Sequence, residues 1–124
     1  MRINELIEEI KKEMLGYNLE LNVSEITPKI AVLITDKLDW HNDNIEYYVR
    51  KCSNDLFYFS DGGYIEDEFK LMGKQNEYEE FKKLILISGY EVNEDGIVFI
   101  GSFLHGVMYM NQLFEFAKVF LEEA

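Results

Sequence analysis

The residue types best suited to chemistry gather in one short polar stretch, residues 35–44. Three aspartates and one histidine lie within eight positions there, namely Asp36, Asp39, His41 and Asp43. Carboxylates and an imidazole are ligands for Mg²⁺, Mn²⁺ or Zn²⁺, and a bound cation could polarise a phosphate and activate water. In an extended stretch Asp39, His41 and Asp43 would share one side, because side chains alternate along a strand. The alternative is that these residues turn the backbone by accepting hydrogen bonds from neighbouring N–H groups.

The spacing of these aspartates superficially resembles a calcium-binding loop, but two positions disagree. Asn44 stands where such a loop needs its turn glycine, and Arg50 stands where it needs a bidentate glutamate. No lysine is placed as common nuclease motifs require. The sequence therefore predicts no calcium loop, and we expect no resident metal or other cofactor.

The other side chains that could act as nucleophiles do not stand in any recognisable catalytic motif. Cys52 is predicted in a hairpin loop, and no nucleophile motif places a histidine beside it. Ser60 lacks a nucleophile elbow, and Gly62-Gly63 lacks the helix-opening pattern of a phosphate-binding loop. His105 is interpreted as a capping or packed histidine. The sequence thus predicts no catalytic residue and favours a protein that is not an enzyme.

Length and composition indicate a single folded domain spanning residues 1–124. Hydrophobic residues make up 48% of the chain and aromatic residues 15%, which is enough for one hydrophobic core in a domain of 124 residues. No run approaches the roughly 18 apolar residues of a membrane span, and no signal-peptide pattern is present. The lone cysteine cannot form an internal disulfide. We therefore expect a cytoplasmic protein without a membrane partner.

The acidic charge is uneven along the chain. The formal net charge is −12, which argues against direct binding to nucleic acid or an anionic membrane. Residues 36–68 hold nine acids and three bases, so this quarter of the chain supplies half of the net charge. Such a stretch could dock a basic protein, although net charge also serves solubility. The residues predicted to form this surface are Asp36, Asp39, Trp40, His41, Asp43, Asp61, Glu66, Asp67 and Glu68.

Hydrophobic periodicity predicts the elements that position these residues. Strands are predicted over 17–23, 30–34, 45–49, 56–59, 90–92 and 97–100. Helices are predicted from a cap at Asn4 to Gly16, over 64–72, from a capping box at Asn76 and Glu79 to Gly89, and over 107–122. Neighbouring strands bracketed by helices, without βαβ alternation, favour an α+β fold. We expect a small antiparallel sheet with amphipathic helices at both termini and two helices inserted after the central hairpin.

About residues 28–90 also resemble a known family. The runs that carry the resemblance are Thr35-Asp36-x-x-Asp39-x-x-x-Asp43-x-Ile45-x-x-Tyr48-Val49 and Phe57-x-Phe59-Ser60-Asp61-x-Gly63-Tyr64, followed by a short helix ending at Gly73. The family is the bacterial and phage family called domain of unknown function 1828. Its members often have Thr-Pro at Thr35-Asp36, and Asp-Asp-Gly at residues 61–63, so this chain departs at both places. The resemblance implies no activity. It does imply that the protein is encoded by a phage or other mobile element and acts in a conflict between phage and host.

Two hypotheses follow from the sequence. The first is a non-enzymatic, phage-encoded or mobile-element-encoded inhibitor whose acidic surface mimics nucleic acid and occupies a basic nucleic-acid-binding site on a host defence nuclease or regulator. The alternative is a metal-dependent hydrolase or nuclease that uses Asp36, Asp39 and Asp43.

Overall fold

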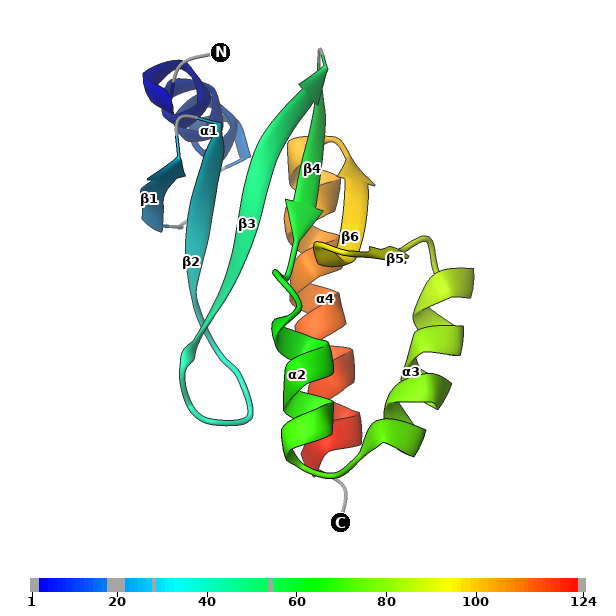
Figure 1. Ribbon diagram of the computed structural model, residues 1–124. Coiled ribbons are helices and arrows are strands. Elements are labelled where there is room, and N and C mark those ends of the chain that lie inside the picture. Colours follow the sequence, from blue (N-terminus) through cyan, green and yellow to red (C-terminus); the bar gives the residue numbers. More distant parts are fainter. Residues whose placement is uncertain (1–2, 18–21, 28, 54, 123–124) are drawn as a thin grey trace.

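The structure is a computed structural model of the 124-residue chain that describes residues 3–17, 22–27, 29–53 and 55–122. Figure 1 shows the arrangement of its helices and strands. The elements in chain order are α1 (Ile3–Tyr17), β1 (Asn22–Thr27), β2 (Ile30–Leu38), β3 (Asn44–Ser53), β4 (Leu56–Ser60), α2 (Tyr64–Leu71), α3 (Gln75–Ile87), β5 (Glu91–Asn93), β6 (Gly96–Gly101) and α4 (Phe103–Glu122). The predicted α+β class is confirmed, with helices at both termini and two helices after the central β3–β4 hairpin.

The described strands form one antiparallel six-stranded sheet in the order β1-β2-β3-β4-β6-β5. Strands β1 to β4 follow one another as neighbours, whereas β6 pairs with β4 across the two inserted helices α2 and α3. Helix α1 contacts β2, α4 contacts β4 and β6, and the two helices contact each other. Both helices therefore lie on one face of the sheet, behind the strands in Figure 1.

Strand β3 shows how the sequence separates the two faces of the sheet. Ile45, Tyr47 and Val49 are buried toward α1 and α4, whereas Glu46 and Tyr48 between them are exposed. This is the period-two alternation of a strand with one face in the core. In the described part of the chain, no helix packs over β2, β3 and β4 on the opposite face (Figure 1), which we call the open face.

Helix α4 packs unusually close to the sheet at Gly106. A Cβ atom built on Gly106 would lie 1.8 Å from Cε2 of Phe59, so glycine is needed for this close approach. Five further residues along the same stripe of α4 are buried. They are Met110, Leu113, Phe114, Ala117 and Leu121.

Several predicted boundaries at the chain's N-terminal half are wrong. Asn4 does not cap α1, because that helix already begins at Ile3. Tyr17 ends α1 and does not begin a strand; the strand in this region is β1, and residues 18–21 of the prediction lie outside the described residues. Cys52 lies within β3, exposed, and not in the hairpin loop, because β3 continues four residues beyond Val49.

Helices α3 and α4 begin at other residues than predicted. The capping box at Asn76 is wrong, since α3 begins at Gln75 after Lys74 without a side-chain cap. On α3, Tyr78, Phe81 and Ile85 are buried, whereas Leu84, which follows the same apolar period, is 40% exposed. Helix α4 begins at Phe103, four residues earlier than predicted, so exposed His105 lies in its first turn and is neither a cap nor a packed residue.

Candidate interaction site

The aspartate-rich segment forms a tight turn between β2 and β3. The backbone N–H of Asp39 donates to the carbonyl of Asp43 at 2.8 Å, and Asn42 adopts a left-handed conformation with φ of 62°. Oδ1 of Asp39 accepts hydrogen bonds from the backbone N–H of His41 at 2.8 Å and of Asp43 at 3.1 Å. The turn-forming interpretation is thereby confirmed for Asp39, and the extended arrangement with Asp39, His41 and Asp43 on one side is wrong.

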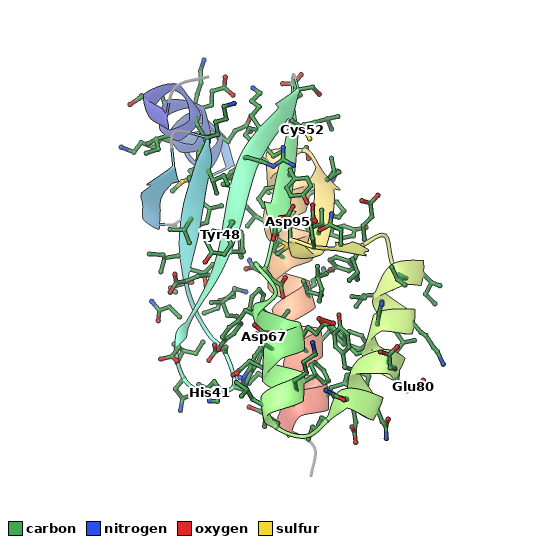
Figure 2. All side chains as sticks on the ribbon, in the orientation of Figure 1. His41, Tyr48, Cys52, Asp67, Glu80 and Asp95 are labelled. Carbon is green, nitrogen blue, oxygen red and sulfur yellow. The ribbon has the colours of Figure 1, made fainter. Side chains whose placement is uncertain are left out.

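Side chains fasten this turn to α2. Oδ2 of Asp39 accepts a hydrogen bond from the hydroxyl of Tyr64 at 2.9 Å. Oε1 of Glu68 accepts one from Nε1 of Trp40 at 3.0 Å and also contacts Nε2 of His41. Burial, reinforced by the bond to Asp39, raises the pKa of the Tyr64 hydroxyl. Figure 2 shows His41 at the turn, beside α2.

Ring stacking holds the same turn from the inside. The rings of Trp40 and Tyr64 stack with centroids 5.6 Å apart, and Trp40 also stacks on Phe114 of α4 at 6.2 Å. Offset-stacked rings at these distances add attraction beyond their buried area. Trp40 is therefore half-buried, and its ring packs within the protein and is not free to contact a partner.

Asp61 joins the end of β4 to α2 and β6. Its Oδ1 accepts hydrogen bonds from the backbone N–H of Gly63 at 3.0 Å and of Ile97 at 2.8 Å, and its Oδ2 accepts one from Ile65 at 2.9 Å. The side chain is 2% exposed, and burial raises its pKa although the three N–H donors oppose that shift. The buried carboxylate of Asp61 thus links the end of β4 to the start of α2 and to β6.

The nine residues predicted to form one contact surface do not all lie on the surface. Asp39, Asp61 and Glu68 are buried, with exposed fractions of 4%, 2% and 7%, so their inclusion in a contact surface is corrected. Exposed members are Asp36, His41, Asp43 and Asp67, whereas Trp40 and Glu66 are half-buried. Among the described residues, no three His, Cys, Asp or Glu side chains converge as a metal site would require, so the structure does not bring Asp36, Asp39 and Asp43 together as one.

Two hollows that sequence reasoning missed lie on either side of Tyr48. The first, of about 380 Å³, is on the open face, with Tyr48, Arg50, Tyr58, Ser60, Glu94 and Asp95 among its lining residues. The second, also about 380 Å³, lies between β3 and the start of α2, with Asp39, Asp43, Glu46, Tyr48, Asp61 and Tyr64 among its lining residues. Tyr48 lines both hollows, and the β3 residues beside it are Arg50 in the first hollow and Glu46 in the second.

The β5–β6 turn makes one wall of the first hollow. The hydroxyl of Tyr58 donates to Oδ2 of Asp95 at 2.6 Å, and the hydroxyl of Ser60 donates to the Asp95 carbonyl at 2.6 Å. Burial, together with the bond to Asp95, raises the pKa of Tyr58. The guanidinium carbon of Arg50 lies 4.0 Å from the centroid of the Tyr58 ring, a cation–π geometry. The wall is therefore fixed to the sheet by both backbone and side-chain contacts.

Tyr48 itself is 38% exposed, and its ring is supported from below. A Cβ atom on Gly62 would lie 2.6 Å from Cε2 of Tyr48, so the ring rests against the bare backbone of that glycine. Figure 2 shows Tyr48 on the open face of β3. The signal for this position was present in the sequence, because Glu46 and Tyr48 occupy the polar phase of β3 while Tyr47 occupies the core phase.

Comparison with protein-family models, with curated proteins and with solved structures found no match for the chain. Among the helices in the described ranges, none has both the length and the apolar character needed to cross a bilayer.

Proposed function

We propose that this chain is a non-enzymatic acidic interaction domain that binds a basic protein at a site which that protein otherwise uses for nucleic acid. The observation that carries the proposal is the charge around Tyr48. Exposed carboxylates of Asp43, Glu46, Glu94 and Asp95 line the two hollows. Among the described residues lining them there is a single base, Arg50, and its guanidinium already lies over a tyrosine ring.

Physical chemistry supports a basic partner for such a surface. Charge interactions reach about 8 Å at physiological ionic strength, so carboxylates spread along one strand and its neighbouring turn act together on an approaching protein. Complementary charge speeds the encounter of two proteins and fixes their register. A groove of carboxylates also offers the charge sign that a nucleic-acid backbone offers, which would let this domain occupy a phosphate-binding surface.

The proposed setting follows from the resemblance to the phage and bacterial family. In that setting the partner is a host defence nuclease or regulator, the domain is its inhibitor, and both act in the cytoplasm. No observation in the described residues favours the alternative of a metal-dependent hydrolase. Both carboxylate oxygens of Asp39, the central residue of that alternative, accept hydrogen bonds from the protein itself.

Affinity capture tests the proposal. The chain is immobilised, exposed to bacterial lysate at low salt, and eluted first with duplex DNA and then with concentrated salt. We expect a basic nucleic-acid-binding protein to leave in the DNA elution, because DNA and the chain compete for one surface, and we expect the free chain to inhibit its nucleic-acid binding. An unrelated acidic protein of equal net charge is the control. Recovery of chaperones alone, or of proteins that DNA does not release, would contradict the proposal.

A further inference from the structure

We infer that Tyr48 and its two hollows are the docking site for an arginine-rich segment of the partner, which crosses the open face at β3. The inference rests on the proposed function and adds a place and a chemistry to it. It is carried by the unpartnered sheet face, by the support beneath Tyr48 and by the placement of exposed carboxylates on both sides of the ring.

The side chain of Tyr48 is more than a third exposed, on a sheet face that no described helix covers. Covering such an exposed aromatic ring with a partner removes apolar surface from water, which favours binding. The ring packs against the backbone of Gly62, and this contact reduces the side-chain freedom that binding would remove. A fixed, accessible aromatic face is a platform for a cation.

Exposed carboxylates line both hollows beside that platform. Glu46 lines the hollow toward α2, and Glu94 lines the hollow on the open face; both side chains are exposed. A cation over the ring of Tyr48 would therefore have a carboxylate in reach on either side. Arg50 shows the same chemistry within the chain, since its guanidinium already lies on the neighbouring Tyr58 ring.

The chemistry of this surface favours arginine over lysine as the occupant. Guanidinium groups stack on aromatic rings and bind carboxylates with two parallel hydrogen bonds, whereas an ammonium group is a compact and strongly hydrated charge. Two hollows that share Tyr48 as a lining residue suit successive arginines better than one isolated side chain. A second copy of this chain is a poor occupant, because it would bring further carboxylates to a surface that is already acidic.

The test titrates octa-arginine into the chain at low salt and follows amide NMR shifts and calorimetry. We expect shifts centred on Tyr48, Glu46 and Glu94. Tyr48→Ala should weaken binding about three-fold, whereas Tyr48→Phe, which keeps the ring, should stay within about two-fold. Octa-lysine should bind about three-fold more weakly than octa-arginine. Thermal unfolding of each variant confirms that it is folded.

A charge-matched pair of double variants separates a local site from the overall field. Glu46→Gln/Glu94→Gln and Glu79→Gln/Glu80→Gln remove the same charge, but the second pair lies on the exposed side of α3, where Figure 2 labels Glu80. We expect about five-fold weaker binding for the first pair and less than about two-fold for the second.

Each result is decisive. Binding that is equal for both peptides and for all variants would overturn the docking site while leaving an acidic interaction domain. Shifts centred on α3, or self-association of the chain through Tyr48, would overturn the site as well. Absence of binding to either peptide would count against both the site and the proposed function.

Discussion

Replacement of Asp39 gives the sharpest test of whether the aspartate-rich turn is structural. The carboxylate accepts three hydrogen bonds, from the backbone N–H of His41 and Asp43 and from the Tyr64 hydroxyl, and it is almost wholly buried. Asp39→Ala removes all three acceptors, while Asp39→Asn keeps one oxygen for the two backbone donors. The amide nitrogen can then donate to the Tyr64 oxygen. The two variants should therefore differ strongly.

The magnitudes follow from the number and type of bonds. At roughly 1 kcal/mol net for each lost hydrogen bond, Asp39→Ala should lower the free energy of unfolding by about 3 kcal/mol. Asp39→Asn keeps the bonds but loses their charge-assisted part, so about 1 kcal/mol is expected. The matched control is Asp36→Ala on the exposed end of β2, which should change stability by less than about 0.5 kcal/mol.

Urea unfolding followed by far-ultraviolet circular dichroism measures all three variants. The reasoning would be refuted if Asp39→Ala were as stable as the wild type, or if Asp39→Asn were as costly as Asp39→Ala. A rise in melting temperature with millimolar Mg²⁺ that Asp39→Asn abolishes would instead support the metal alternative, because a ligand that binds only the folded state stabilises it.

Two further predictions concern the core and the β4–α2 turn. Gly106→Ala gains about 1 kcal/mol of helix propensity but drives its methyl group into Phe59, so we expect a net loss of about 1–2 kcal/mol that Phe59→Leu partly restores; higher stability in urea would contradict the packing. Burial raises the pKa of Asp61, so the folded chain binds that proton more tightly than the unfolded chain. The resulting stability is fully present below the unfolded pKa and declines as pH rises through the folded pKa. The melting temperature of the wild type relative to Asp61→Asn should therefore increase from pH 7 toward pH 4, and a constant difference would be evidence against this shift.

The elements were largely predictable because their signals are local. The strand predicted over 45–49 lies within β3, and the helix predicted over 107–122 lies within α4. Helix starts were less predictable. Lys74 precedes α3 without capping it through its side chain, and no local pattern distinguishes this start from one at Asn76.

The candidate site was less predictable because its contacts join distant parts of the chain. Tyr64 lies 25 residues from Asp39, Trp40 lies 28 residues from Glu68, and Ile97 lies 36 residues from Asp61. Spacing within a motif carries no information about such pairs. Buried acidic residues such as Asp39 and Asp61 therefore could not be told from surface residues. The hollow on the open face depends on the pairing of β6 with β4, which brings Glu94 and Asp95 beside Tyr48.

The pairing of β4 with β6 also has a consequence for the order in which the domain assembles. Strands β2, β3 and β4 are joined by short turns, so their ladders close cheaply in entropy, whereas β6 reaches β4 after both α2 and α3. The part of the open face around Tyr48 that β2, β3 and β4 form, the floor of the first hollow, therefore forms early. The wall of that hollow at Glu94 and Asp95 forms late. During synthesis on the ribosome, the floor emerges before the chain has reached residue 94. The complete groove is a property of the finished chain and not of its emerging hairpins.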